Sequence, residues 1–425
     1  MEIIKNLNKN DWKETFQRPS IEFEAISEAV DEIFREVEKK GDKALFRYTN
    51  FFDKAKLDKL KVSDEELDLC DSEISEDLKD AIKIACNNIQ KFHNTQSIVD
   101  VKVKIEDGIN CWQKHVPIEN VGLYIPGGSA PLFSSVLMLA IPAKLAGCKN
   151  INLCSPPNSA GKIHPAILYA AKEAGVKNIY KIGGIQAIAA MAIGTESISK
   201  VDKIYGPGNQ YVTAAKLKAL QYNTAIDMPA GPSEVLIIAD QSAKPGYLAA
   251  DLLSQAEHGP DSQVILISWD EMIIKETIEE LKGQIELIPR SNIAKKSLEH
   301  AKIILCKDDN EAISLSNFYA PEHLIIATEN TSILADRVIN AGSVFLGNYS
   351  PESAGDYASG TNHTLPTSGF AKSFSGLNIF SFMKKISFQE ISKSGLNNLA
   401  KTITCMAEEE GLIAHKNAVK IRLKD

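Results

Sequence analysis

A regular alternation of short apolar segments with helical stretches constrains the fold of this chain more than any other feature. It begins near Asn120 and is punctuated by glycine- and proline-containing turns. The apolar segments, in chain order, are VGLYIPGG, INLCSPP, IYKIGG, KIYGPG, SEVLIIAD, SQVILIS, KIILC, HLIIAT and SVFLG. Strands that alternate with helices form βαβ units, in which neighbouring strands run parallel. Because these segments are more numerous than the strands of one ordinary open sheet, we expect two sheets.

The two ends of the chain have a helical pattern instead. An amphipathic run extends from Ser20 to about Lys40, where Gly41 predicts its end, and a second helical run extends from about Ser75 to His93. Past about residue 380 the pattern again indicates helix, up to the C-terminal segment LIAHKNAVKIRLKD. We therefore expect helical segments on both sides of the sheet-forming region.

Charge, cysteine content and apolar run length exclude several classes of protein. The net charge of −8 disfavours a globally basic nucleic-acid-binding protein. Seven scattered cysteines without a CxxC motif argue for a reducing compartment and against a disulfide framework or a zinc ribbon. The longest apolar run, Val136 to Ala143, is too short to span a bilayer, and the N-terminus lacks an apolar signal core. We expect a cytoplasmic protein that binds neither nucleic acid nor membrane.

Two glycine-containing turns are candidates for ligand binding. The segments YIPGGS (124–129) and YGPGN (205–209) each follow a predicted strand and precede a predicted helix. Glycine lets the backbone approach a ligand closely, and the start of the next helix can accept an anion such as a pyrophosphate. Neither turn matches GxGxxG, so tight βα turns without a ligand remain the alternative. Both lie at the carboxyl ends of strands, where ligands of parallel sheets bind.

Further candidates are histidines with a possible partner. Gln255 and His258 are three residues apart at the end of a predicted helix and share one face. An amide oxygen beside an imidazole can bind zinc, but glutamine is an uncommon ligand, and this segment alone favours a histidine at a helix C-terminus, which the macrodipole stabilises. His415, in the segment LIAHKNAV, would by itself be interpreted as a surface residue.

Glu322 and His323 immediately precede the strand LIIAT and could form a general-base pair. Adjacent residues on an extended strand point to opposite faces, which weakens a joint role unless the backbone turns there. The polar loop of residues 350–363 carries Asp356 and His363, which have the residue types of a metal-binding or substrate-binding pair. Such loops also form ordinary Asx and Ser/Thr turns, so both interpretations stay open.

Longer segments resemble a known family when they are taken together. They occur in order as VGLYIPGGSAPLFSSVLMLAIPAKLAG, KVDKIYGPGN, IDMPAGPSEVLIIAD, DLLSQAEHGPDSQVIL, PEHLII, AGSVFLGNYSPESAGDYASGTNHTLPT and LIAHKNAV. The sequence resembles the histidinol dehydrogenases, which use zinc and NAD, from about residue 20 to the end and most strongly between residues 121 and 363. Ala320 departs from the pattern, because glycine is common in the family before the PEH motif.

The resemblance implies a four-electron oxidation of L-histidinol through L-histidinaldehyde to L-histidine, the last step of histidine biosynthesis, with NAD as the oxidant. It implies that His323 removes the alcohol proton and that Glu322 activates the water that hydrates the aldehyde. One zinc ion per subunit is expected on Gln255, His258, Asp356 and His415. Substrate contacts are expected from the same zinc ligands and from Ser233, His323, His363 and Glu410. Cofactor contacts are expected from Tyr124, Gln186 and Asn209.

Pattern and resemblance together predict an α/β fold with two Rossmann-like domains, whose parallel-rich sheets are flanked by helices, plus helical N-terminal and C-terminal arms. The expected division is an N-terminal arm (1–19), a first domain with the zinc and catalytic residues (20–123 and 233–377), a second domain with the NAD contacts (124–232) and a dimerisation arm (378–425). The resemblance also implies an intertwined homodimer, in which Glu410 and His415 would be supplied to the partner's site.

Two other functions remain as alternatives. A zinc-dependent hydrolase could use Glu322 to activate water and His258 as a ligand, but it would leave Tyr124 and Gln186 without a role. An inactive binding paralogue on the same fold would be expected to lack a ligand or a base. The complete set is present here: Gln255, His258, Glu322, His323, Asp356 and His415.

Overall fold

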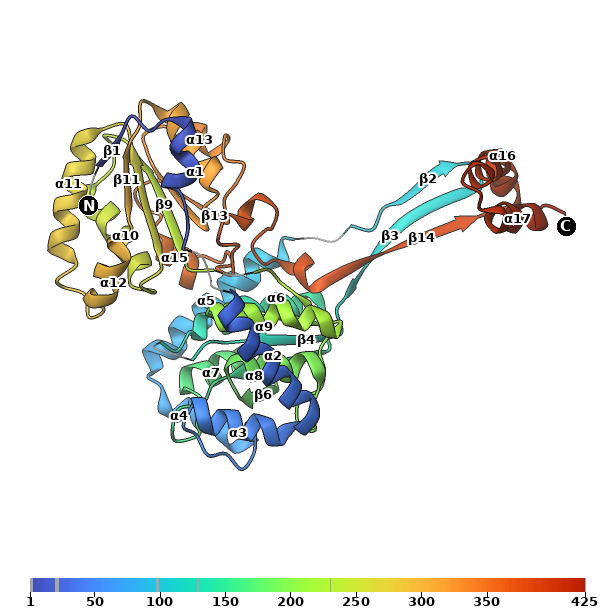
Figure 1. The fold of residues 1–425 in the computed structure, drawn as a ribbon, viewed down its shortest axis with the longest axis horizontal. Coiled ribbons are helices and arrows are strands. Elements are labelled where there is room, and N and C mark those ends of the chain that lie inside the picture. Colours follow the sequence, from blue (N-terminus) through green and yellow to red (C-terminus); the bar gives the residue numbers. More distant parts are fainter. Residues whose placement is uncertain (1–2, 20–22, 97–98, 128–129, 230, 425) are drawn as a thin grey trace.

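The computed structural model describes residues 3–19, 23–96, 99–127, 130–229 and 231–424. Two α/β domains lie next to each other, and a long arm extends away from them and carries the C-terminal helices at its tip (Figure 1). Within the described ranges, no helix combines the length and the apolar character needed to cross a membrane.

One domain is built on a parallel sheet with the strand order β1-β11-β10-β9-β12-β13. The strands are β1 (Ile3–Lys5), β9 (Glu234–Ala239), β10 (Gln263–Ser268), β11 (Lys302–Leu305), β12 (His323–Ala327) and β13 (Ser343–Leu346). One face is covered by α10 (Pro245–Ala256), α11 (Glu271–Gln284) and α12 (Ser291–Leu298), and the other by α1 (Trp12–Thr15), α13 (Asp309–Tyr319) and α14 (Thr331–Ala335). Strands β9 and β10 are buried along their whole length because helices cover both faces.

The other domain is built on a parallel sheet with the order β6-β5-β4-β7-β8. Its strands are β4 (Asn120–Tyr124), β5 (Asn150–Ser155), β6 (Asn178–Lys181), β7 (Lys203–Tyr205) and β8 (Ala225–Ile226). One face packs on α4 (Asp64–Glu73), α5 (Glu76–Asn94), α6 (Phe133–Ala146) and α7 (Pro165–Glu173), and the other on α2 (Phe23–Lys40), α3 (Asp42–Phe52), α8 (Gly184–Ile193) and α9 (Gln210–Ala219).

The predicted strands of both sheets are confirmed, but the elements near the N-terminus are grouped differently from the expectation. Helices α2 to α5 pack on the five-stranded sheet rather than with residues 233–377, because their apolar faces enter its two cores. Val30 and Phe34 of α2, for example, are buried with Ile188 and Val212. Strand β4 also belongs to this sheet from Asn120 on. The described part of residues 1–19 supplies β1, which pairs with β11, so this segment is an edge of the six-stranded sheet rather than a free arm.

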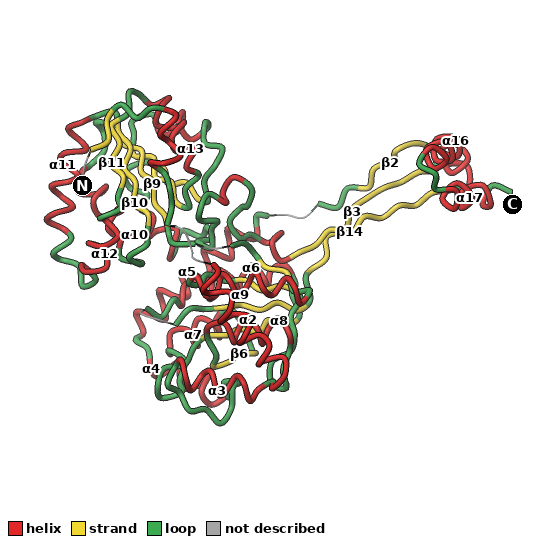
Figure 2. The backbone as a smooth tube through the Cα atoms, viewed as in Figure 1, coloured by secondary structure: helices red, strands yellow, loops and turns green. Residues whose placement is uncertain are grey.

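The arm is an antiparallel sheet of β2 (Lys102–Glu106), β3 (Ile109–Pro117) and β14 (Met383–Ile391), with α16 (Lys393–Glu409) and α17 (Ile413–Arg422) at its end (Figure 2). The prediction of helix for the whole C-terminal segment is therefore wrong for β14. Phe388 of this strand stacks on Trp112 of β3, with ring centroids 5.3 Å apart. The alternation of Ile386 and Phe388 with polar residues was the signal for a strand.

Candidate active site

A cleft of about 1200 Å³ lies between the two domains and receives side chains from both. Seven of the residues predicted for the site line it: Tyr124, Gln186, Asn209, Ser233, His258, Glu322 and His363. The cleft therefore brings the expected cofactor contacts and part of the expected chemical machinery into one space.

One wall is the carboxyl edge of the five-stranded sheet. Tyr124 ends β4, and its hydroxyl oxygen accepts a hydrogen bond from the backbone N–H of Gly184, at 3.1 Å. Asn209 caps α9, since its side-chain oxygen accepts two N–H groups of the first turn. Consecutive connections change direction between β4 and β7 in this sheet. Tyr124 and Asn209 thus lie at the topological switch point, where doubly wound sheets bind ligands.

Hydrogen bonds with two buried charged side chains hold the YGPGN turn at this edge in place. Gly206 has φ +128°, and a Cβ atom there would lie 2.1 Å from the carbonyl oxygen of Tyr124, so only glycine fits. The buried ammonium of Lys216 donates to the carbonyl of Gly206 at 2.9 Å, and the Asp227 carboxylate accepts the N–H of Gly206 at 2.8 Å. Lys216 and Asp227 also form a buried ion pair. The backbone of the turn is therefore rigidly placed beside the cleft.

Two polar atoms along this wall fit a cofactor. The Oε1 atom of Gln186 is buried and accepts no hydrogen bond from any described residue. The same holds for Oδ2 of Asp53, which also lines the cleft and whose pKa is raised to about 6 by burial. Unpaired buried acceptors are costly unless a ligand or water satisfies them. The residues of this wall thus suit a ligand that carries several hydroxyl or amide donors, such as NAD.

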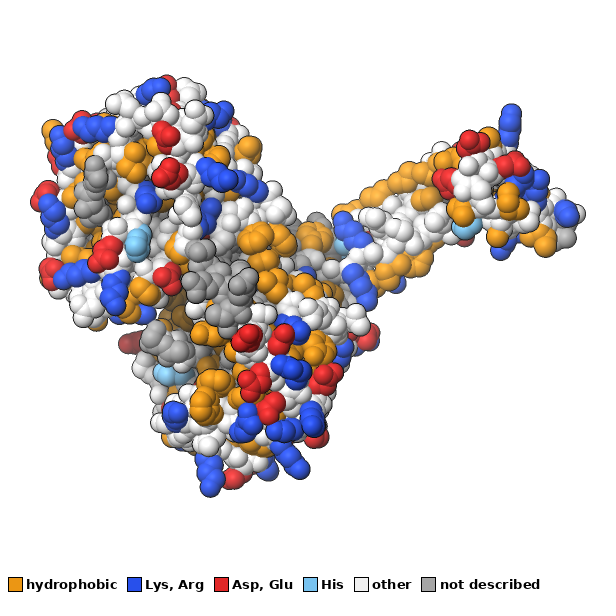
Figure 3. All heavy atoms as spheres, in the orientation of Figure 1, with side chains coloured by type: hydrophobic (Ala, Val, Ile, Leu, Met, Phe, Trp, Pro, Cys, Tyr) orange, Lys and Arg blue, Asp and Glu red, His pale blue; other side chains and the backbone are white. Residues whose placement is uncertain are grey.

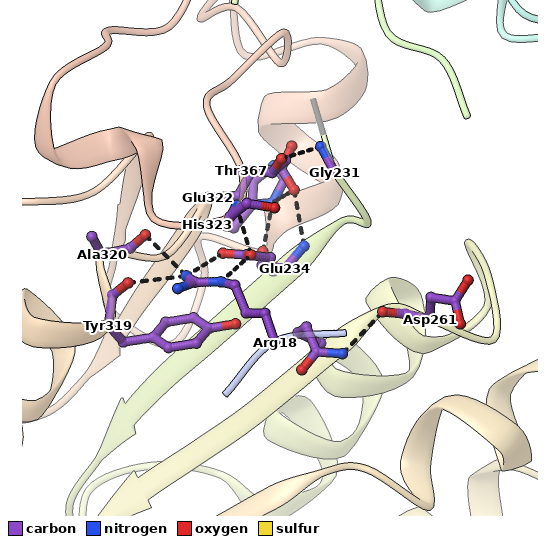
Figure 4. Close-up of polar contacts among 11 residues, drawn as sticks. Arg18, Gly231, Glu234, Asp261, Tyr319, Ala320, Glu322, His323 and Thr367 are labelled. Carbon is purple, nitrogen blue, oxygen red and sulfur yellow. Dashed lines mark hydrogen bonds and ion pairs between the residues drawn. The ribbon is translucent and has the colours of Figure 1, made fainter. Parts of the chain in front are cut away.

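The opposite wall contains the amino ends of β9 and β12. Glu322 precedes β12 and His323 begins it, and both side chains contact the backbone of Glu234 at the start of β9 (Figure 4). The Glu322 carboxylate accepts the N–H of Glu234 at 2.9 Å, and Nδ1 of His323 lies 3.1 Å from the carbonyl oxygen of Glu234. The objection that adjacent residues point apart does not apply, because the regular strand starts only at His323.

Burial and charge shift the pKa values of this pair in different ways. Burial raises the pKa of the Glu322 carboxyl to about 7. Burial alone would lower the pKa of His323, but the nearby carboxylates of Glu352, Glu322 and Asp356 outweigh it and raise that pKa to about 10. Near neutral pH, Glu322 is therefore partly ionised, whereas these carboxylates keep His323 protonated unless a bound cation offsets their charge.

A set of metal-type donors lies beside His323. Ligand atoms of His258, Glu352 and Asp356 are all within 4.8 Å of one another. Gln255 is buried, and its amide nitrogen donates to Oε1 of Glu352 at 2.7 Å when the amide is oriented with nitrogen toward that carboxylate. Imidazole nitrogen and carboxylate oxygen are common zinc ligands, so these residues fit a divalent cation.

Glu352 was missed in the sequence. Its signal was the spacing of four residues from Asp356 in SPESAGD, which puts both carboxylates on one side of the short helix α15 (Glu352–Tyr357). His363 follows in the same segment and joins the two domains. Its Nε2 atom lies 3.1 Å from the hydroxyl of Ser135 on α6, and its Nδ1 atom 2.8 Å from the carbonyl of Asp356.

Glu410 and His415 are not brought to this cleft within the chain. Glu410 follows the last turn of α16 and His415 lies on α17, and both are exposed. They belong to the tip of the arm, far from the two domains (Figure 1). Of the four predicted zinc ligands, Gln255, His258 and Asp356 gather around Glu352, whereas His415 does not.

Two doubly wound α/β domains that enclose acid–base and metal-type side chains are typical of a two-domain enzyme, with the cleft as the candidate active site. The sequence model of the histidinol dehydrogenase family matches residues 16–423. A histidinol dehydrogenase of Bacteroides thetaiotaomicron is 56% identical over 423 residues, 100% of this chain and 99% of that protein. One of Haemophilus influenzae is 52% identical over 422 residues, 99% of this chain and 98% of that protein.

The crystal structure of histidinol dehydrogenase from Elizabethkingia anophelis superposes with a TM-score of 0.97 at 54% identity, covering 100% of this chain and 98% of that one. The chain belongs to the histidinol dehydrogenase family, a family of oxidoreductases. The hydrolase and the binding paralogue are not favoured.

Proposed function

We propose that this protein oxidises L-histidinol through L-histidinaldehyde to L-histidine, with NAD⁺ as the hydride acceptor in both steps, as the last reaction of histidine biosynthesis. The observation that carries the proposal is the composition of the interdomain cleft. In this cleft, Tyr124 and Asn209 at the switch-point edge of the five-stranded sheet face Glu322 and His258 of the other domain. A cofactor and a small polar substrate can therefore meet there.

In the first step, a hydride leaves the carbinol carbon only as the oxygen loses its proton, so a base must lie beside that oxygen. We assign this role to His323, whose orientation is held by the carbonyl of Glu234 and by carboxylates around the ring. In the second step the aldehyde must be hydrated before it can lose a hydride. Glu322, with its pKa raised to about 7, is suited to take the proton from the attacking water.

The cofactors are assigned to residues by fit. We propose that Tyr124, Gln186 and Asn209 contact NAD⁺, which would accept the hydride when bound. One zinc ion per subunit would be held by Gln255, His258 and Asp356 together with His415 of the partner subunit. Zinc, when bound, would act as a template for the imidazole and amine of histidinol. Ser233 and His363, which line the cleft, would contact the substrate.

We further propose an intertwined homodimer in which Glu410 and His415 enter the partner's cleft. Among the residues that the structure describes, the arm sheet has three strands and no helix packs along it, so it buries little apolar surface of its own. Hydrophobic side chains gather along the arm (Figure 3). They include Val103, Ile105, Ile386, Phe388, Met406, Ile413 and Ile421, each at least 36% exposed. A second copy that covers this surface would bring α17 to the other subunit.

The cytoplasmic location is part of the same proposal, and seven unpaired thiols support a reducing compartment.

The test is the stoichiometry of the reaction. Purified, zinc-loaded protein is incubated with limiting L-histidinol and excess NAD⁺, and NADH is followed by absorbance. We expect two NADH for each histidinol, since four electrons leave as two hydrides. One NADH, or none, would contradict the proposal, and turnover without NAD⁺ would point to the hydrolase. A mass in solution of twice the chain mass tests the dimer.

A further inference from the structure

One partly buried guanidinium, that of Arg18, holds the two backbone segments on which the proposed bases depend. Nε of Arg18 donates to Oε1 of Glu234 at 2.6 Å, and Nη2 donates to Oε2 at 2.8 Å, which makes a bidentate pair (Figure 4). Glu234 is 1% exposed, and its Oε1 also accepts the backbone N–H of Ser368 at 2.8 Å. The start of β9 is therefore fixed in position and in orientation.

The same guanidinium holds the turn that leads into Glu322. Nη2 of Arg18 also donates to the carbonyls of Tyr319, at 2.9 Å, and Ala320, at 3.4 Å. Its central carbon lies 3.8 Å from the centre of the Tyr319 ring. Ala320 adopts φ +58°, a conformation that glycine takes more easily, which agrees with the glycine that the family resemblance predicts at this position. The contacts from Arg18 support this strained turn.

Both sets of contacts converge on Glu322 and His323. The N–H of Glu234 holds the Glu322 carboxylate, and its carbonyl holds Nδ1 of His323. A shift of Glu234 would therefore move both groups together. A shift of the 319–320 turn would displace the backbone that directly precedes them.

We propose that Arg18 and Glu234 are a positioning pair for Glu322 and His323, so that the N-terminal segment sets the geometry of the site without touching the substrate. This inference rests on the proposed function. Lysine cannot replace the planar fork of arginine at a bidentate, ring-stacked site. An anchor that served only to stabilise the fold would alter stability but not the turnover of the folded enzyme.

The experiment compares Arg18→Lys and Arg18→Ala with Arg337→Ala in the full-length, zinc-loaded protein. Arg337 is a matched control, because it forms hydrogen bonds with Asp309 and Asn310 in the same domain but does not contact Glu234. We expect the Arg18 variants to lose about 10- to 100-fold in kcat with KM values for histidinol and NAD⁺ changed less than about threefold, as for misplaced catalytic groups. Arg337→Ala should keep its kcat.

Two further readouts separate positioning from stability. Millimolar guanidinium should partly restore the kcat of Arg18→Ala, whereas methylammonium, which lacks the planar fork, should not. Without substrate, the ring ¹⁵N resonances of His323, assigned with His323→Gln, should shift in Arg18→Lys and stay in place in Arg337→Ala.

Wild-type kcat and unshifted His323 resonances in folded Arg18→Lys would overturn the inference, as would an equal loss of kcat in Arg337→Ala. Wild-type protein that produces no NADH would contradict the proposed function instead, and the resonance comparison would then decide the positioning role alone.

Discussion

The Glu322 carboxyl combines burial, a backbone hydrogen bond from Glu234 and a pKa raised to about 7. In Glu322→Gln, the amide oxygen can still accept that hydrogen bond, but the side chain can no longer take a proton from water. We expect oxidation of the aldehyde to fall by about 10²- to 10⁴-fold and oxidation of the alcohol to fall less. Assays started separately with L-histidinol and L-histidinaldehyde measure both. Equal losses would contradict the water-activating role.

The Glu352 carboxylate accepts a hydrogen bond from the amide nitrogen of Gln255 and lies beside His258 and Asp356. Residues that orient metal ligands usually change metal affinity by about 10- to 100-fold when they are removed. We expect Glu352→Ala to weaken zinc binding by that amount, measured by chelator competition. Glu352→Gln keeps an oxygen acceptor for Gln255 and should lose less. The exposed Glu299→Ala serves as the control. Unchanged affinity in Glu352→Ala would show that this carboxylate does not support the metal.

Burial of the Asp53 carboxyl lowers the free energy of unfolding by an amount that depends on pH. Burial raises its pKa from 3.8 to about 6, so the folded protein binds this proton more tightly than the unfolded chain does. The free energy of unfolding therefore decreases as the pH rises through this interval. Asp53→Asn should be about 1 kcal/mol more stable than wild type at pH 8, after allowance for solvent screening, and equal to it at pH 3.5. Denaturant titrations without ligands at both pH values test this, and a less stable variant at pH 8 would contradict it.

At the scale of elements, buried strands were predictable and exposed strands were not. The strands of the two parallel sheets, such as β9 and β10, are continuous apolar runs because both faces are covered. Strands β2 and β14 alternate apolar and polar residues but are short of buried side chains, and the prediction assigned β14 to helix because helical segments surround it. The packing of helices α2 to α5 on the five-stranded sheet is a tertiary choice that the helical periodicity does not specify.

The same difference applies to the site. Gln255, His258, Glu322 and Asp356 belong to contiguous motifs, so the resemblance could locate them before the structure did. Arg18 is 216 residues from Glu234, and no local pattern connects the two. Such pairs become visible only when the fold brings β9 and the N-terminal segment together.

Helix α17 is the element that links the arm to the proposed metal site. It packs on α16 at the tip of the arm and away from both domains (Figure 1). Truncation before Gly411 should therefore leave both domains folded but lower the zinc content per chain, because His415 is lost. Metal analysis beside circular dichroism measures this, and full-length His415→Ala should show a similar loss. Unchanged zinc content would show that the C-terminal segment supplies no ligand.

At the scale of the whole molecule, an intertwined dimer predicts complementation between inactive subunits. His415→Ala has an intact Glu322, and Glu322→Gln has an intact His415. Coexpression of the two should form heterodimers with one complete site, so a statistical mixture recovers roughly a quarter of the wild-type activity. Each variant expressed alone is the control. A mixture no more active than its components would show that each arm serves its own chain.

The placement of the two sheets brings helix termini with partial charges of opposite sign to the two walls of the cleft. Helices α8 and α9 begin at one wall, where the macrodipole of each helix places partial positive charge. Helix α10 ends near the other wall, just before His258, and its last carbonyls carry partial negative charge. An anionic pyrophosphate is therefore favoured on the first wall, and a divalent cation or a protonated amine on the second. The helix dipoles therefore favour the proposed arrangement, with the cofactor on the first wall and the cation and substrate amine on the second.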